Sequence, residues 1–243
     1  MNLRWLASSF IVSALLLFGA GCKFAPAKPE PAAQRPDQVS NFAALYQQNC
    51  AACHGERGKN GVAISLANPV YLAVAGTDMI QKATANGVPG TLMPAFAKSQ
   101  GGMLTDQQIT VLAQGVESAW GNPAAIQGKS ASPYASSSPG DPAQGQQAFT
   151  TFCASCHGSD GTGLKRKENS TGSLVDPAYL ALISDQGLRS LIIAGQPEEG
   201  MPDWRSDMAG AGSRPMSDKE TTDIVAWLAS HRVATPGQPY AHP

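Results

Sequence analysis

Apolar side chains recur at three- and four-residue spacing in four segments of the chain, which is the spacing of one face of an α-helix. The first and third of these segments carry their apolar positions at Phe42, Leu45, Tyr46, Cys50 and Cys53 and at Ala148, Phe149, Phe152, Cys153 and Cys156. The second and fourth carry them at Ile109, Leu112, Val116 and Trp120 and at Ile224, Trp227 and Leu228. The pattern predicts an all-α protein built from helices and loops.

Capping residues mark where three of these helices begin. Thr105 and Ser217 are each followed, three positions later, by a Gln or a Glu, which is the pattern of a capping box. Asp141 stands before Pro142, the arrangement expected of an N-cap followed by proline at the first helical position. The predicted helix starts therefore rest on local residues as well as on periodicity.

Two halves of the chain repeat the same unit. The pentapeptide Cys50–His54 returns as Cys153–His157, and each copy is followed by Gly. The segment Gly87–Pro94 returns as Gly195–Pro202, and both copies have the frame Gly-x-Pro-x-x-x-Met-Pro. A unit of this size that occurs twice indicates a tandem domain duplication rather than a solenoid.

Stretches rich in proline, serine and alanine separate the predicted parts of the chain. Residues 122–140 contain three prolines and a run of three serines, so we predict a linker between a first domain at 38–121 and a second at 141–233. Residues 22–37 contain four prolines among alanines and are predicted to form an extended tether. Residues 234–243 form a short tail.

The repeated pentapeptide has the form Cys-x-x-Cys-His, the attachment signature of a c-type haem. The two thiols form thioethers to one porphyrin, and the histidine that follows becomes the proximal ligand of its iron. Two copies make a chance match improbable. We therefore predict two covalently bound haem c groups, attached to Cys50, Cys53, Cys153 and Cys156, with His54 and His157 as proximal ligands.

Two other uses of paired cysteines have to be weighed against haem. A structural zinc site would need the four motif cysteines together, but its pairs usually lie about 15–20 residues apart and these lie about a hundred apart. A thioredoxin-like redox pair would need a βαβ pattern, and neither motif is surrounded by one. Only Cys22 remains outside the motifs.

The order of elements in each half is helix, Cys-x-x-Cys-His motif, loop, helix, Met-Pro and closing helix, and this order resembles the class I cytochrome c family. The resemblance covers nearly all of the chain after the tether and implies two tandem class I cytochrome c domains. It also implies that the first and last helices of each domain cross closely, a Gly on one against an aromatic on the other. The repeat offers Gly145 with Trp227 and, with the two roles exchanged between helices, Gly115 with Phe42.

The iron of each haem needs a ligand opposite its histidine. Met93 and Met201 occupy the same place in the repeated frame, and class I cytochromes carry their axial methionine in such a Met-Pro context. We predict Met93 and Met201 as distal ligands; the alternative is methionine that only fills the core. Ligation by a second histidine is disfavoured, since only His231, at a helix end, and His242, in the tail, remain. The sequence does not name the carbonyl that accepts from each proximal histidine.

The N-terminus has the pattern of an export signal. Arg4 precedes an apolar stretch at 5–17, and small residues lead to Cys22. We predict a signal peptide at 1–21 and a lipoprotein anchored through Cys22 on the periplasmic side of a bacterial membrane. The alternative is an uncleaved anchor helix at 5–21, which is about long enough to span a bilayer.

Charge and ligands together narrow the function. The formal net charge is -1 and charged residues make up 14% of the chain, so no basic field for nucleic acid is predicted. Two irons with His and Met ligands would leave no open position for a substrate, so we predict an electron-transfer protein rather than an enzyme. It would be a membrane-tethered di-haem cytochrome, a mobile carrier or a fixed subunit, that links respiratory or photosynthetic partners. These partners would be a quinol-oxidising complex, a terminal oxidase or a reaction centre.

The alternative function is a catalytic di-haem enzyme of the peroxidase or thiosulfate-oxidising type. A peroxidase needs one haem that opens for peroxide. The thiosulfate-oxidising enzymes resemble this chain in layout but use a cysteine as axial ligand, and the cysteine count leaves none for that role.

Overall fold

The computed structural model describes residues 34–166, 170–205 and 214–233. The predicted signal peptide, the lipid site at Cys22, most of the predicted tether and the predicted tail lie outside these residues. Contacts divide the chain at Arg35, and the described residues from Pro36 onwards belong to one compact unit. Within the described ranges, no helix is long and apolar enough to cross a membrane.

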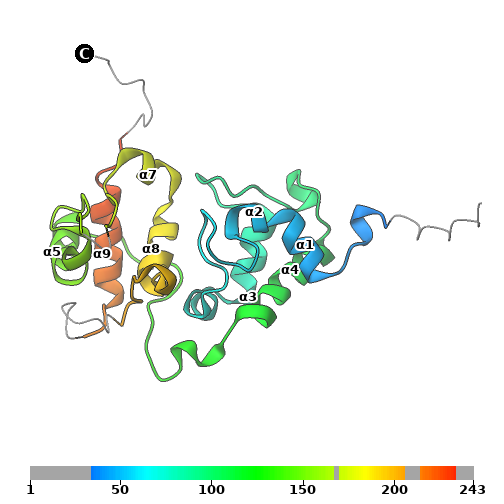
Figure 1. Ribbon diagram of the computed structural model, residues 1–243, viewed down its shortest axis with the longest axis horizontal. Helices are drawn as coiled ribbons and strands as arrows, with labels where there is room; N and C mark the ends of the chain where they lie inside the picture. The colour runs from blue at the N-terminus through cyan, green and yellow to red at the C-terminus, as the bar shows by residue number, and fades with distance from the viewer. Residues whose placement is uncertain (1–33, 167–169, 206–213, 234–243) are drawn as a thin grey trace, which may run out of the picture. The chain divides into compact units, whose positions relative to one another are not determined.

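The described part of the chain consists of helices and loops, with two isolated β-bridges, so the all-α prediction is confirmed (Figure 1). The first repeat and the segment after it contain η1 (Pro36–Gln38), α1 (Phe42–Asn49), α2 (Ala51–His54), α3 (Pro69–Asn86), η2 (Lys98–Gln100), α4 (Asp106–Trp120) and η3 (Pro123–Ile126). The second repeat contains α5 (Pro142–Phe152), α6 (Ala154–His157), α7 (Pro177–Leu182), α8 (Asp185–Ala194), η4 (Pro197–Glu199) and α9 (Asp218–Ala229).

The helices begin where their capping residues predict. Thr105 and Ser217 each accept a hydrogen bond from the backbone N–H three residues on, and both capping boxes are complete. Asp141 accepts from the backbone N–H groups of α5. Asn68 caps α3 in the same way and precedes a proline, as does Asp176 at α7. Each cap satisfies N–H groups that have no partner inside the helix.

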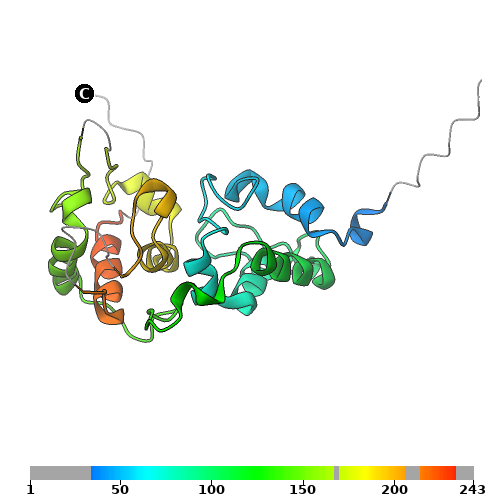
Figure 2. The same ribbon diagram turned by 60° about the horizontal axis from the view of Figure 1, so that its bottom comes forward.

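The first and last helices of the second domain cross at Gly145. Helices α5 and α9 lie side by side in both ribbon views (Figures 1 and 2). A Cβ atom on Gly145 would lie 2.0 Å from the Asp223 carbonyl oxygen and 2.8 Å from Trp227 Cβ. The Phe149 and Trp227 rings pack with centroids 4.4 Å apart. The predicted contact between Gly145 and Trp227 is confirmed.

The first domain makes the same crossing with the residue types exchanged. A Cβ atom on Gly115 of α4 would lie 2.1 Å from Phe42 Cδ2 of α1. Trp120 adds edge contacts with Phe42 and Tyr46, at centroid distances of 5.8 and 5.0 Å. The second predicted pair is therefore confirmed too. In this domain the glycine faces a side chain, whereas Gly145 faces backbone.

Part of the predicted linker is fixed to the second domain. Arg189 of α8 has only 3% of its side chain exposed. Its guanidinium donates to the Pro133 and Tyr134 carbonyls, to Thr222 at 2.9 Å and to the Asp218 carboxylate. A buried guanidinium is costly unless all its N–H groups have acceptors. The need for these acceptors holds residues 133–134 against α8 and α9.

Candidate haem-binding sites

Each Cys-x-x-Cys-His motif forms one short helical turn after a bend in the chain. Cys50 ends α1, where its N–H donates to the Tyr46 carbonyl at 2.8 Å. Its own carbonyl accepts from the His54 N–H at 3.0 Å, so the same residue starts α2. Cys153 joins α5 to α6 with the same backbone angles. Both cysteines and the histidine of each motif therefore lie within one short helical turn.

The motif thiols are free, and burial favours the neutral form of the first thiol in each motif. All four motif cysteines are free, with no disulfide among them. Burial, and then the neighbouring Cys53, raises the pKa of the Cys50 thiol to about 11. Burial and Cys156 raise the pKa of Cys153 to about 12. Within the described residues, no group of three or more His, Cys, Asp or Glu is arranged to hold a metal ion.

His54 is held in one tautomer. Only 8% of the residue is exposed, and its Nδ1 lies 2.8 Å from the Ile64 carbonyl oxygen. A carbonyl can only accept, so Nδ1 carries the proton and Nε2 keeps its lone pair for a metal. Burial lowers the pKa of the imidazole, which favours the neutral form that ligation needs. Ile64 supplies the acceptor that the sequence could not name.

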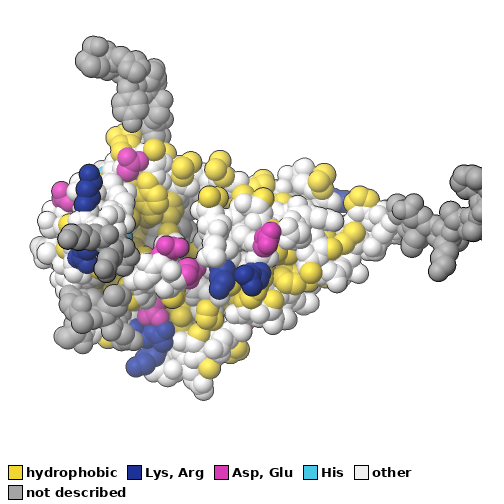
Figure 3. All heavy atoms as spheres, viewed as in Figure 1, with side chains coloured by type: hydrophobic (Ala, Val, Ile, Leu, Met, Phe, Trp, Pro, Cys, Tyr) yellow, Lys and Arg dark blue, Asp and Glu magenta, His cyan; other side chains and the backbone are white. Residues whose placement is uncertain are grey.

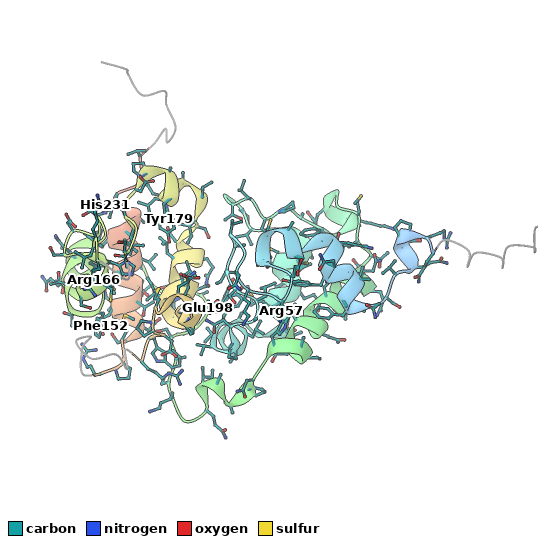
Figure 4. All side chains as sticks on the ribbon, viewed as in Figure 1. Arg57, Phe152, Arg166, Tyr179, Glu198 and His231 are labelled. Atoms are coloured by element: carbon teal, nitrogen blue, oxygen red, sulfur yellow. The ribbon has the colours of Figure 1, made fainter. Side chains whose placement is uncertain are left out.

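In the described part of the second repeat, no carbonyl takes the place that Ile64 has beside His54. The Nδ1 of His157 is buried and has no hydrogen-bond partner among the described residues. Burial also lowers the pKa of this imidazole. The loop that follows the motif differs between the repeats, because five extra residues are inserted around Lys165 and Arg166. Thr171 at the base of this insertion donates to the Cys156 carbonyl. Arg166 donates to the Ser155 carbonyl, and its side chain is labelled in Figure 4.

Tyr46 supports the first motif, although the sequence predicts it only as an apolar position of its helix. Its hydroxyl donates to the Gly55 carbonyl at 2.8 Å, directly after the motif. Burial, and then Cys50, raises the pKa of this phenol to about 12, so it stays a donor. The equivalent residue of the second repeat is Phe149, which has no hydroxyl. The sequence feature that could have predicted this bond is a tyrosine four residues before the first cysteine of the motif.

The Met93 loop closes tightly after α3. Gly87 ends the helix at φ +69°, and a Cβ there would lie 2.7 Å from the Ala95 nitrogen. The Val88 N–H donates to the Met93 carbonyl at 3.1 Å. Thr91 accepts from the Met93 N–H at 3.2 Å. The loop therefore fixes the backbone of Met93, whose side chain is partly buried.

The Met201 loop repeats this arrangement after α8. Gly195 has φ +66°, and a Cβ there would lie 2.5 Å from the Pro202 carbonyl carbon. Gln196 and Met201 exchange both backbone hydrogen bonds, at 2.9 and 3.0 Å. Met201 is partly buried. By contrast, Met216 is 8% exposed and packs in the core.

Each domain thus offers one complete set of groups for a haem c. The set has two free thiols, an imidazole whose neutral form is favoured and a thioether on a closed loop, and this donor chemistry fits the group. His231 lies beyond the end of α9, and its Nδ1 is used in a 2.9 Å bond to the Trp227 carbonyl (Figure 4).

Two family matches cover most of the described chain. Residues 37–114 match the family described as "Cytochrome C oxidase, cbb3-type, subunit III". Residues 142–232 match the family described as "Cytochrome c". The two matches leave residues 115–141 between them, a stretch that includes the predicted linker.

Similar proteins include subunits of respiratory complexes. The chain is 25% identical over 252 residues to a cytochrome bc1 complex cytochrome c subunit of Corynebacterium diphtheriae, covering 98% of this chain and 83% of the relative. It is 29% identical over 178 residues to the cbb3-type cytochrome c oxidase subunit FixP of Sinorhizobium medicae, covering 68% of this chain and 54% of that subunit. The chain thus spans only about half the length of that oxidase subunit.

A solved structure that resembles the chain is thiosulfate dehydrogenase TsdBA from Marichromatium purpuratum, with a TM-score of 0.31 and 18% identity. The match covers 81% of this chain and 43% of that one. The family matches, which agree with the helical repeats and their motifs, show that this protein consists of two cytochrome c domains in tandem.

Proposed function

We propose that this protein transfers electrons through two covalently bound haem c groups and transforms no small molecule at them. The observation that carries the proposal is the duplication of a complete donor set. Each domain has a Cys-x-x-Cys-His turn and a closed Met-Pro loop. The relatives named above are subunits of electron-transfer complexes, which supports the same role.

The side chains have separate tasks in this role. Cys50 and Cys53 would attach the first haem, and Cys153 and Cys156 the second. His54 and His157 would supply the proximal nitrogen. Met93 and Met201 would supply a soft, uncharged sulfur on the other face, which favours ferrous iron and closes the site to substrates. The bound group supplies the one-electron chemistry.

The partners and the location follow from the same reasoning. We propose that the domains face the periplasm and are tethered to the membrane through lipid on Cys22. The donor and acceptor would be a quinol-oxidising complex and a terminal oxidase, or a reaction centre. On the face drawn in Figure 3, acidic and basic side chains lie in small groups among hydrophobic ones. A surface of this kind suits the small, short-lived interfaces of redox partners.

Oxidation of the reduced, lipid-bearing protein tests this function. In membranes of its own cells we expect rapid oxidation that stops when the terminal oxidase is inhibited. Peroxide or oxygen alone should oxidise the purified protein slowly, because a histidine and a methionine would hold each iron and leave it no open position. Turnover of peroxide or thiosulfate at enzyme-like rates would instead support a catalytic di-haem protein.

The two proximal histidines predict unequal reduction potentials. The bond from His54 to the Ile64 carbonyl would make that imidazole a stronger donor and stabilise ferric iron. The Nδ1 of His157, which has no partner among the described residues, would not. We expect the second haem to be reduced first in a redox titration. The two steps are assigned by finding which one moves in Met93→Ala and which in Met201→Ala. If the first haem has the higher potential, the histidine bonds do not set the order.

A further inference from the structure

Asn68 belongs to the first domain but contacts the methionine loop of the second. Both are parts of the compact unit that begins at Pro36. Its Nδ2 donates to the Ala194 carbonyl at 3.0 Å and to the Gly195 carbonyl at 3.1 Å. Only 5% of Asn68 is exposed. These carbonyls end α8, where the helix itself provides no donors.

The same side chain also caps its own helix. Asn68 Oδ1 accepts from the N–H groups of Val70 and Tyr71 at 2.9 and 3.2 Å. Both ends of the amide are therefore used, one inside the first domain and one on the second. A buried amide satisfied at both ends has a fixed position, because any movement would leave a polar group unpaired.

The repeat explains why this residue is an asparagine. The equivalent position in the second repeat is Asp176, which caps α7 equally well through the N–H groups of Ala178 and Tyr179. Asp176 is exposed. A carboxylate can cap a helix but cannot donate to a carbonyl. The amide is thus required only at position 68, where a second bond is made.

The contact falls at the base of the Met201 loop. Gly195 packs against Pro202, and the neighbouring Gln196 exchanges both backbone bonds with Met201. A shift of the Gly195 carbonyl would therefore also move the backbone of Met201, because Met201 is bonded to the next residue, Gln196, by two hydrogen bonds. The far side of the loop is held as well, since Arg205 donates to the Ala125 carbonyl of η3 at 3.2 Å.

Packing around Asn68 supports a close junction. Side chains from α3, from the connecting segment and from α8 line one small void that has no room for water: Tyr71, Val74, Tyr134, Ser190, Ile193 and Ala194. Asn68 itself is 5% exposed, and burial strengthens hydrogen bonds such as those from its amide to the two carbonyls.

We propose that Asn68 is a positioning residue for the second haem: from the first domain, it holds the loop that carries Met201. The proposal rests on the axial role of Met201 and adds to it a control that crosses the domain boundary. The first haem, whose domain contains Asn68, does not depend on this bond.

The test uses Asn68→Asp in the complete protein with both haems. Asp keeps the helix cap, as Asp176 shows, but removes both donors and places a carboxylate against two carbonyls. We expect carbon monoxide to bind the reduced second haem about tenfold faster, the change expected for the loss of two hydrogen bonds. The weak charge-transfer band between methionine sulfur and ferric iron should fall toward half.

Two backgrounds assign the effect to one haem. In Met93→His the band reports only the second haem, and in Met201→His only the first. Asn68→Asp should weaken the band in the Met93→His background and leave it intact in the Met201→His background. If the parent Met93→His protein has no band, Met201 is not a ligand and the proposed site is wrong.

Two further variants distinguish the loss of the Asn68 hydrogen bonds from a general loss of folding. Asn68→Ser keeps a capping oxygen without a charge and should raise carbon monoxide binding to the second haem in the same direction. Asp176→Asn, the reverse change at the exposed equivalent, should alter neither haem. An unchanged band in Met93→His carrying Asn68→Asp, or an equal loss in both backgrounds, would overturn the positioning role.

Discussion

Replacing Gly145 by Val is expected to unfold the second domain at a temperature more than about 10 °C below that of the native protein. Any Cβ at this position would lie 2.0 Å from the Asp223 carbonyl oxygen, and backbone cannot rotate away as a side chain can. The cost should reach about 3 kcal/mol, the upper range for overpacking, and a domain of this size loses roughly 4–8 °C for each kcal/mol. Thermal unfolding followed by haem absorbance measures the change.

Two controls separate the crossing from the general effect of valine. Ala143→Val lies at an exposed position of the same helix and should change the melting temperature little. Gly115→Val should destabilise the first domain less, because its Cβ meets the Phe42 ring, which is partly exposed and can turn aside. Native melting of the second domain in Gly145→Val would refute the close crossing of α5 and α9.

Replacing either methionine by alanine is expected to open one iron. Met201→Ala should halve the charge-transfer band, allow carbon monoxide to bind one of the two reduced haems and lower that haem's potential, because a thioether stabilises ferrous iron. Met93→Ala should do the same at the other haem, and the double variant should lose the band completely. Absorbance and redox titration of the purified proteins measure all three effects.

Met103→Ala is the matched control for the ligand assignment. Met103 has no equivalent in the other repeat and is 81% exposed, so its removal should leave the band, the potential and carbon monoxide binding unchanged. A full band in both Met93→Ala and Met201→Ala would show that the distal ligands lie elsewhere in the chain.

The features that the sequence predicts well are those set by neighbouring residues. The capping boxes at Thr105 and Ser217 follow from hydrogen bonds within one helical turn, and the structure confirms both. The crossing of Gly145 with Trp227 was also predictable, because the resemblance to class I cytochromes c implies that the first and last helices of each domain meet. The haem motifs follow from residue type and spacing, and their ligand roles stay predictions.

The features that the sequence does not predict depend on where a backbone carbonyl lies in space. Ile64 accepts from His54 because of the path of a loop, and any residue type could do the same. Asn68 donates a hydrogen bond to the Ala194 carbonyl, which lies 126 residues away in the sequence. The mismatch between Asn68 and Asp176 in the repeat was visible, but it takes the fold to show that only the first has carbonyls within reach.

The hydrogen bonds of Arg189 determine where a fragment containing the second domain must begin if it is to fold stably. A fragment that begins at residue 141, where the repeat begins, would lose the Pro133 and Tyr134 carbonyls and leave a buried guanidinium short of acceptors. A fragment that begins about ten residues earlier would keep them. The repeat therefore begins later in the chain than the segment that supplies acceptors to the buried arginine of the second domain.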